Sequence, residues 1–409
     1  VKNLQGNPSF IMDNVASVEA IDERTAVITQ LEPDPSLLAK LAFTSLGIID
    51  SEEAKAHGAT DAEDAAETDT AEEWLNNNSI GSGPYMLEKW EPKVETILVR
   101  NPEFAGTPAA IGRVIYRTVS DAAAQKLGLE AGDIDVALDI SADQVPSLQE
   151  NPAIEVYEAA SNTVFFLIMN MDPDIGGPLS NDLVQDAIRL AVDYDGLRLL
   201  AGGAAGTPVN IMPVQWAYAL DPAQGIQRDV AAAQAKLAEA GYADGLSVEL
   251  LYPEFTSGGI AIGTLAQKVQ ADLAEAGITV QLSPGDIGVE LEKYRNAEAP
   301  FGLWLWGPDF IDPIDRLAFT PGGTVGLRVN WDDSNASPDL VEAVSAARVA
   351  TDPADREAAF TGIQGIMLDE SPFVFLVQSG VQVAYNASLQ GFTYSDSALG
   401  RVDPYLMSK

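Results

Sequence analysis

The stretch that decides the fold is DVAAAQAKLAEAGYADGLSVELLY, residues 229–252. Asp229 suits the N-cap of a helix, and the Ala-rich sequence after it predicts that this helix runs to Ala240. Gly241 ends the helix, because glycine adopts the left-handed conformation that lets the chain reverse. A strand is expected over Ser247–Tyr252. The stretch therefore predicts a helix that returns into a neighbouring strand.

The same order of elements returns in LAQKVQADLAEAGITVQL, residues 265–282, with Gly277 between helix and strand. This is a repeated architecture and not a repeated sequence. Alternation of helices and strands with short loops is typical of an α/β protein. Further helices are expected over residues 37–43 (with Ser36 as N-cap), 122–130 (with Asp121 as N-cap), 183–201, 340–350 and 355–368, and further strands over 26–29, 95–100, 113–118, 134–137, 164–169 and 373–377.

The length of 409 residues and the 46% hydrophobic content predict more than one buried core, and so two or three lobes. The most apolar stretch is VFFLIM, Val164–Met169, which has the length of a buried strand and is followed by Asn170. No run of about 18 consecutive apolar residues appears, so the sequence contains no candidate membrane-spanning helix.

The charge balance is strongly acidic, with 23 basic and 61 acidic residues and a formal net charge of -38. Such a field repels nucleic acid phosphates and anionic lipid head groups. The acidity indicates either a solvated surface or attraction of cationic ligands. We favour a solvated surface, because the acids are spread along the chain. Their densest patch, Asp61–Glu73, is expected to be an exposed helix or loop.

Most catalytic equipment is missing from the sequence. There is no cysteine, which excludes disulfides and thiol nucleophiles. His57 is the only histidine, in an acidic stretch where we expect an isolated, solvent-facing side chain. No nucleophile elbow and no glycine-rich phosphate loop appears. An acid-pair hydrolase stays open, because 61 acids produce many chance pairs. We expect no enzyme.

Eight short phrases, in a fixed order along the chain, carry a family resemblance. They resemble the dipeptide-, oligopeptide- and nickel-binding proteins of the bacterial extracellular solute-binding family 5, which serve ABC importers. The phrases are GSGPY at 81–85 with Trp90, NPEF at 101–104, LEAGDID at 129–135, KLAEAGY at 236–242, LAEAGI at 273–278, WGPD at 306–309 with Asp312-Pro313, DPADR at 352–356 and Gly391-Phe392.

The resemblance implies an α/β fold of the type II periplasmic binding proteins (cluster C), with mixed sheets and a hinge between two lobes. Asn14–Thr29 is similar to the end of the family's inserted subdomain, so a further N-terminal part of the first lobe is expected before Val1. The implied division is 1–78 for the remainder of the inserted subdomain, 79–175 for the core of lobe 1, 176–385 for lobe 2 and 386–409 for the return to lobe 1.

The implied ligand site centres on the stretch WLWGPD, Trp304–Asp309. By resemblance, Asp309 holds the free amine of a peptide and Trp306 packs beside it, with Trp304 close by. A carboxylate accepts strong hydrogen bonds from an ammonium group, and an indole supplies a rigid apolar wall. From spacing alone we would prefer the alternative, in which Asp309 caps a turn before Asp312 and the tryptophans belong to the core.

Four more residues are implied as lining of the site: Asn170, Trp216, Tyr218 and Arg328, with Arg328 as the partner of a ligand carboxylate. The first three side chains are more often structural than ligand-facing. We expect no metal and no cofactor.

The acids Asp309, Asp312 and Asp315 stand three residues apart, which suggests a cation site. They lack the alternating ligands and the central glycine of a calcium loop. Helix capping and solvated charge are the better explanation.

The resemblance implies the substrate-binding component of an ABC importer, which closes its lobes on a di- or oligopeptide and delivers it to a membrane permease. It implies a monomer in the periplasm or outside the cell, either free or held by a lipoprotein anchor. An oligosaccharide, an opine or a nickel chelate stays open as ligand, although one peripheral histidine disfavours nickel. A scaffold for unfolded chains is the remaining alternative.

Overall fold

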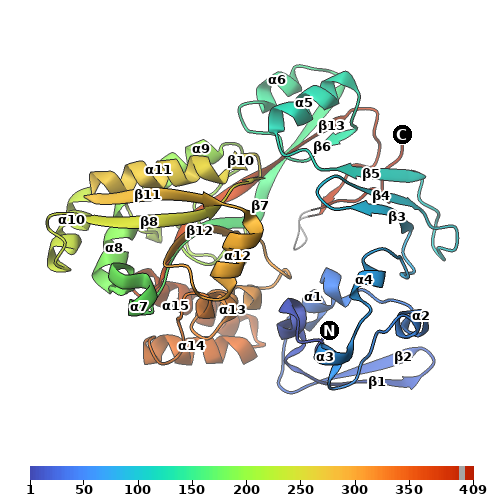
Figure 1. Ribbon diagram of the computed structural model, residues 1–409, viewed down its shortest axis with the longest axis horizontal. Coiled ribbons are helices and arrows are strands. Elements are labelled where there is room, and N and C mark those ends of the chain that lie inside the picture. Colours follow the sequence, from blue (N-terminus) through green and yellow to red (C-terminus); the bar gives the residue numbers. More distant parts are fainter. Residues whose placement is uncertain (396–400) are drawn as a thin grey trace. The chain divides into compact units, whose positions relative to one another are not determined.

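The computed structural model describes residues 1–395 and 401–409, and the chain forms two compact units (Figure 1). Unit 1 comprises Val1–Val119, Asp309–Ile311 and Ala387–Lys409, and unit 2 comprises Ser120–Pro308 and Asp312–Asn386. Each unit is described by itself. The lobe boundaries expected from the sequence stay a prediction.

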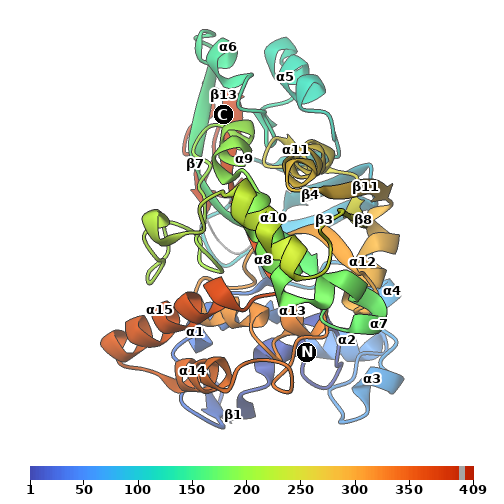
Figure 2. The same ribbon diagram turned by 90° about the vertical axis from the view of Figure 1, so that its left-hand side faces the viewer.

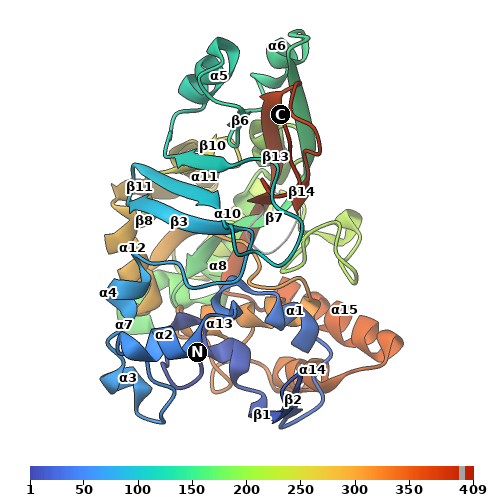
Figure 3. The same ribbon diagram turned by 90° about the vertical axis from the view of Figure 1, so that its right-hand side faces the viewer.

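Unit 1 contains a three-stranded antiparallel sheet in the order β3-β4-β5 (Figure 1) and a hairpin of two strands, β1 and β2 (Figure 3). The hairpin pairs β1 with β2 in antiparallel register. The strands are β1 (Val15–Asp22), β2 (Thr25–Gln30), β3 (Tyr85–Glu91), β4 (Glu95–Arg100), β5 (Arg113–Arg117), β14 (Tyr394–Ser395) and β15 (Arg401–Val402). The helical segments are η1 (Asn7–Met12), α1 (Leu37–Leu41), η2 (Thr44–Leu46), α2 (Ser51–Ala56), α3 (Ala65–Thr68) and α4 (Glu72–Leu75).

Two expectations for unit 1 need correction. Ser36 precedes α1 but its side chain makes no capping bond; its hydroxyl donates to Asp34 Oδ1 at 2.5 Å instead. His57 is not isolated, because its ring stacks on Trp74 with centroids 3.7 Å apart and lies 3.2 Å from Glu53 Oε1. The acidic patch around these residues folds into the short helices α3 and α4, as the sequence indicated.

Unit 2 is built on a six-stranded mixed sheet in the order β11-β8-β12-β7-β13-β6. The pairs β11–β8 and β8–β12 are parallel, and the remaining pairs are antiparallel. The strands are β6 (Val136–Ala137), β7 (Ile154–Met169), β8 (Leu246–Pro253), β11 (Ile278–Gly285), β12 (Phe301–Trp306) and β13 (Phe373–Asn386), with a separate pair of β9 (Thr256–Ser257) and β10 (Ile260–Ala261). β7 and β13 extend well beyond the apolar stretches that predicted them.

The sheet is covered on both faces, and this explains the unbroken apolar run in β7. Alternate residues of a strand point to opposite faces. Phe165 and Leu167 enter a core shared with α8–α11, whereas Phe166 and Ile168 enter a second core with α12–α15. Every position of this part of β7 is therefore buried, as in strands covered on both faces.

The helices of unit 2 lie on the two faces of the sheet (Figures 1 and 2). A third, smaller core joins α5 and α6 to the far ends of β7 and β13. The helical segments are α5 (Ala122–Ala131), α6 (Val145–Gln149), α7 (Pro173–Gly176), η3 (Gly177–Ser180), α8 (Asp182–Ala191), α9 (Tyr194–Ala201), η4 (Pro222–Gln224), α10 (Val230–Glu239), α11 (Ile262–Glu275), α12 (Ile287–Arg295), η5 (Pro313–Phe319), α13 (Thr324–Leu327), α14 (Pro338–Val349) and α15 (Pro353–Asp369).

The helix expected over residues 183–201 is wrong, because the structure has two helices there. The chain leaves the helical conformation at Val192, and Asp193 begins α9 by accepting a bond from Gly196 N. The backbone N–H of Asp193 donates to Asp272 Oδ2 on α11 at 3.1 Å. Apolar periodicity continues across this break, so the pattern alone did not reveal it.

The expected caps and stops of the decisive stretches are confirmed. Asp229 accepts from Ala232 N at the start of α10, and Asp121 accepts from Ala124 N at the start of α5. Gly241 and Gly277 both have φ of 93°, the left-handed conformation that glycine adopts without strain. Within residues 1–395 and 401–409, no helix combines the length and the apolar character needed to cross a membrane.

Candidate functional site

The two candidate tryptophans of WLWGPD stand at the end of β12 and have different surroundings. Trp304 is 5% exposed and stacks on Tyr294 of α12, with centroids 4.7 Å apart and planes 16° apart. This geometry favours a core role for Trp304. Trp306 is half-buried, with its ring edge-on to Phe319 at 5.8 Å. Of the two rings, Trp306 is the one with surface left for a ligand.

Arg328 places its guanidinium between two of these aromatic rings. Its Cζ lies 5.1 Å from the ring centre of Tyr294 and 5.4 Å from that of Trp306. Cation–π contacts of this kind hold a guanidinium in a defined orientation. Among the described residues, no carboxylate lies within ion-pair distance of Arg328. Burial and the positive charge of Arg328 lower the pKa of the neighbouring Arg295. The end of β12 is therefore locally positive in a protein of formal charge -38.

Trp216 belongs to a loop that follows a Pro-containing stretch, and it is fastened to the sheet. Its Nε1 donates to Oδ1 of Asn162 on β7 at 2.6 Å. The guanidinium of Arg316 lies 4.8 Å from the centre of its ring, and Arg316 itself is fully buried. The ring of Trp216 stays partly exposed. The structure thus holds this indole in place by one hydrogen bond and one cation–π contact.

Tyr218 lies two residues further along the same loop. Its φ of 70° is in the left-handed region, which is strained for a residue with a bulky side chain. Its ring stacks on Phe360 of α15 with centroids 5.9 Å apart, and its carbonyl accepts from Gln364 Nε2 at 2.7 Å. Backbone strain of this kind persists only where the surroundings hold it in place.

Asn170 is fully buried and its side chain is engaged in structural bonds. Its Nδ2 donates to the carbonyls of Ala297 and Ala299, and its Oδ1 accepts from Asp172 N and from Asn330 Nδ2. An amide with its donors and acceptor in use has little capacity for a ligand. The geometry favours the structural alternative for Asn170.

The three acids spaced along residues 309–315 have separate environments. Asp309 is half-buried and belongs to unit 1, whereas Asp312 and Asp315 belong to unit 2. Asp312 caps η5 and accepts from Arg356 Nη2 at 2.8 Å. Asp315 is 4% exposed, with Oδ2 at 3.7 Å from Arg316 Nε, so solvated charge is the wrong explanation for this residue. In the described part of the chain, no three His, Asp or Glu side chains gather in the geometry of a metal site.

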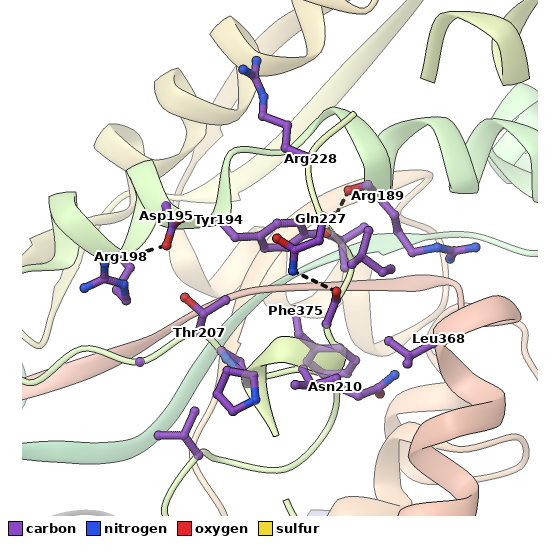
Figure 4. A pocket seen from close by; sticks show the side chains of 18 of the residues that line it. Arg189, Tyr194, Asp195, Arg198, Thr207, Asn210, Gln227, Arg228, Leu368 and Phe375 are labelled. Atoms are coloured by element: carbon purple, nitrogen blue, oxygen red, sulfur yellow. Dashed lines mark hydrogen bonds and ion pairs between the residues drawn. The ribbon is translucent and has the colours of Figure 1, made fainter. Parts of the chain in front are cut away.

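A cavity of about 580 Å³ lies elsewhere in unit 2, between α8, α9, the loops around residues 206–214 and 222–228, and the start of β13 (Figure 4). Its volume suits a small ligand. None of the residues that the sequence suggested for the site lines it.

The arginines of this cavity are already bonded within the protein. Arg189 donates to Asp186 Oδ1 at 2.6 Å, Arg228 Nη2 lies 3.1 Å from Glu275 Oε2, and Arg198 Nη2 lies 3.7 Å from Asp195 Oδ1. A further ion pair lies nearby, in which Lys268 Nζ is 2.8 Å from Asp193 Oδ2. The first and third pairs lie within α8 and α9, whereas Arg228 joins the start of α10 to α11 and Lys268 joins α11 to the start of α9, so the charged wall of the cavity has a structural use.

Sequence reasoning missed the residues that support the candidate tryptophans. Asn162, Arg316 and Tyr294 carry no motif, and their role depends on partners far away in the chain. Gln378 had one usable signal, because it interrupts the apolar run FVFLVQSG of residues 373–380. A polar residue inside an apolar strand marks a position where a buried hydrogen bond is required.

The fold is of the class of the type II periplasmic binding proteins, because solved structures of that class match this chain. The periplasmic binding protein DppA of Helicobacter pylori, solved with the peptide STSA and described as ABC transporter-associated, gives a TM-score of 0.77 at 23% identity. The match covers 93% of this chain and 71% of that one. A dipeptide-binding protein of Pseudoalteromonas sp. SM9913, solved with Met-Leu, gives 0.83 at 17% identity, with 100% and 77% covered.

The sequence comparisons give the family. Residues 1–325 match the middle region of the bacterial extracellular solute-binding proteins, family 5. The chain belongs to this family. A protein of Escherichia coli K12 named as the probable D,D-dipeptide-binding periplasmic protein DdpA is 27% identical over 384 residues, which are 92% of this chain and 70% of that protein.

Proposed function

We propose that this family 5 protein captures a di- or oligopeptide outside the cytoplasm and delivers it to the permease of an ABC importer. The observation that carries the proposal is the position of Arg328, which is held between Tyr294 and Trp306 without a carboxylate of the described chain beside it. A guanidinium in such a place recognises a carboxylate by two parallel hydrogen bonds. The carboxylate of a peptide supplies this partner.

Asp309 is the second proposed contact, and it binds the amine of the peptide. It directly follows Trp306-Gly307-Pro308, within the phrase WGPD that resembles the family, although Pro308 is less usual there. A carboxylate accepts charge-assisted hydrogen bonds from an ammonium group. Trp306, Trp216 and Tyr218 are the proposed apolar walls, and Trp304 and Asn170 support them from the core.

The proposed setting follows from the same relatives. The DppA and DdpA proteins are named as periplasmic, and we extend this location to the present chain, free or held by a lipid anchor. The protein acts as a monomer and catalyses no reaction. Ligand binding shifts the conformational equilibrium of the protein toward the ligand-bound conformation, and the permease recognises that conformation.

The decisive experiment is isothermal titration calorimetry of the whole chain with dipeptides and tripeptides. An oligosaccharide, an opine and nickel are titrated separately for comparison. We expect stoichiometric peptide binding without turnover, and a rise in the melting temperature that follows the affinity. Asp309→Asn should weaken peptide binding about tenfold to a hundredfold, since a charge-assisted hydrogen bond contributes roughly 1.5–3 kcal/mol.

The matched control is Asp133→Asn, the same change at an exposed aspartate. It should leave the affinity unchanged. Unaltered peptide binding by Asp309→Asn would remove Asp309 from the site. Binding of the sugar, opine or nickel alone would replace the proposed ligand class, and release of a hydrolysis product would show an enzyme.

A further inference from the structure

We infer that Trp216 is a fixed wall of the ligand site that receives an uncharged apolar side chain, and that Asn162 and Gln378 are positioning residues for it. The inference rests on the proposed function, because it assigns one side-chain subsite of the same ligand. All of the residues involved belong to unit 2.

Asn162 fastens the loop of Trp216 to β7. Its Oδ1 accepts both from Trp216 Nε1 at 2.6 Å and from Gln215 Nε2 at 2.8 Å. Asn162 is 5% exposed, so water competes little for these bonds. The same Gln215 Nε2 reaches the carbonyl of Ser161 at 3.0 Å. Two consecutive loop residues are therefore bound to two consecutive residues of the strand.

Gln378 fastens the same loop to β13. Its Oε1 accepts from Val214 N at 2.8 Å, and its Nε2 donates to Ser161 O at 2.6 Å and to Gln215 Oε1. Gln378 is fully buried. The register of β13 against β7 shifts between Gln378 and Gly380, which frees backbone groups at this point of the ladder. The loop is thus held by two neighbouring strands of the sheet, β7 and β13.

The left-handed backbone of Tyr218 is a further sign that this segment is rigid. With Tyr218 held by Gln364 and Phe360 on α15, both ends of the stretch 214–218 are anchored to different elements. Strain held in this way is a recurrent feature of ligand-binding segments.

The chemistry of the anchored ring indicates what it receives. Its N–H is already donated to Asn162, so it offers a ligand no free hydrogen-bond donor. The guanidinium of Arg316 lies over one face of the ring, 4.8 Å from its centre. This cation already occupies the face where the electron density of the ring would attract a cationic ligand. The remaining partly exposed surface is apolar. It favours an uncharged apolar side chain over a lysine or arginine side chain.

The test uses single-leucine tripeptides with free ends (Leu-Ala-Ala, Ala-Leu-Ala and Ala-Ala-Leu) and their lysine counterparts, titrated into the whole chain. At one of the three positions, wild-type protein should prefer leucine over lysine by about tenfold or more, as expected for burial of an apolar side chain. Trp216→Ala should remove this preference and weaken the leucine peptide about tenfold, with little change for the lysine peptide. Trp90→Ala, at an exposed tryptophan of β3, is the matched control and should change neither.

Positioning is tested by two changes at Asn162. Asn162→Leu removes the acceptor and should lower the leucine preference as Trp216→Ala does, and it should increase acrylamide quenching of tryptophan fluorescence. Asn162→Asp retains an acceptor and should restore the preference to within about threefold, which a general loss of stability would not reproduce. Gln378→Leu should behave like Asn162→Leu.

The inference is overturned if Trp216→Ala weakens leucine and lysine peptides equally, or if it leaves the preference intact. It is also overturned if wild-type protein binds the lysine peptides as tightly as the leucine peptides at every position. These outcomes differ from failure of the proposed function, which would appear as no peptide binding by the wild-type protein. If Asp309→Asn loses peptide binding while Trp216→Ala keeps the preference for leucine, the proposed function stands and only the subsite at Trp216 is refuted.

Discussion

Two arginine–tryptophan contacts in unit 2 have the same chemistry but different surroundings. Arg316 lies against Trp216, is fully buried, donates to the carbonyl of Asn162 at 3.0 Å and has Asp315 at 3.7 Å. Arg328 lies against Trp306 and Tyr294, is partly exposed and has no described carboxylate within ion-pair distance. Arg316 therefore has an acidic side chain and a carbonyl close to its guanidinium inside the protein. Arg328 has no such acidic partner among the described residues.

This difference separates a supporting arginine from the arginine that we propose recognises the ligand. A buried guanidinium requires fixed partners, since removing it from water without them is unfavourable by several kcal/mol. A partly exposed guanidinium between two rings stays hydrated until a ligand displaces the water, while the rings keep it oriented. The contact between arginine and indole therefore does not reveal the role of the arginine, whereas its burial and its charged partners do.

The largest effect is expected from Arg316→Met, which tests whether Arg316 stabilises the fold. It leaves the buried carboxylate of Asp315 without the adjacent guanidinium, so the free energy of unfolding should fall by roughly 3–5 kcal/mol. Urea unfolding monitored by circular dichroism measures it. The double change Asp315→Leu with Arg316→Met should recover part of the loss, because a pair replaced as a whole leaves no single charge. A loss below about 0.5 kcal/mol for Arg316→Met would show that Arg316 is not a supporting residue.

A second prediction concerns the ring of Tyr294 beside Arg328. Burial raises the pKa of Tyr294 to about 12, and the charge of Arg328 offsets part of this rise. In the unfolded chain the phenol loses its proton near pH 10, whereas in the folded chain it keeps the proton to about pH 12. Between these values the unfolded state binds fewer protons, so stability falls as pH rises.

Tyr294→Phe should remove this alkaline loss. Relative to its own stability at pH 8, the variant should lose about 2–3 kcal/mol less than the wild type at pH 12. Urea unfolding at several pH values measures the difference. Parallel curves for Tyr294→Phe and the wild type would show that Tyr294 has the same pKa in the folded and the unfolded chain, which would contradict the prediction.

The third prediction concerns Arg328 itself and sharpens the contrast with Arg316. Arg328→Met should weaken binding of a peptide with a free carboxylate about tenfold, because one charge-assisted contact is lost. Its free energy of unfolding should fall by no more than about 1 kcal/mol, the size of an exposed cation–π contact, and so by much less than for Arg316→Met. Calorimetric titration and urea unfolding of the same preparation separate the two effects.

The ligand provides the control for this change. A peptide with an amidated C-terminus should bind the wild type and Arg328→Met equally, because it lacks the carboxylate. Arg328→Lys should recover only part of the affinity, since an ammonium group cannot make two parallel bonds. An equal loss for the free and amidated peptides would assign Arg328 a structural role and remove the difference from Arg316.

The helices and strands were largely predictable because they depend on local signals. Asp121 and Asp229 are N-caps, and Gly241 and Gly277 adopt the left-handed conformation that ends a helix before a strand. The single helix expected over residues 183–201 failed because the break at Asp193 depends on Asp272, which is remote in sequence. Local patterns do not contain such a partner.

The candidate site was only partly predictable. Trp306 and Arg328 were named from the sequence, and the structure brings Arg328 into contact with Trp306 and Tyr294. Trp216 was also named, but its fastening to Asn162 and its contact with Arg316 were not foreseen. Asn170 was named as lining and is instead engaged with the backbone of residues 297–299.

The sequence by itself determined the α/β character of the chain, the caps and stops of its main helices and its family resemblance, because these follow from residues close together or from short ordered phrases. The tertiary structure alone decided which polar residues are buried against fixed partners and which keep exposed surface. Arg316 and Arg328 have the same side chain, and nothing in their neighbours along the chain separates them. Burial and the charges supplied by distant segments do so, because the energy of a guanidinium depends on what replaces its water.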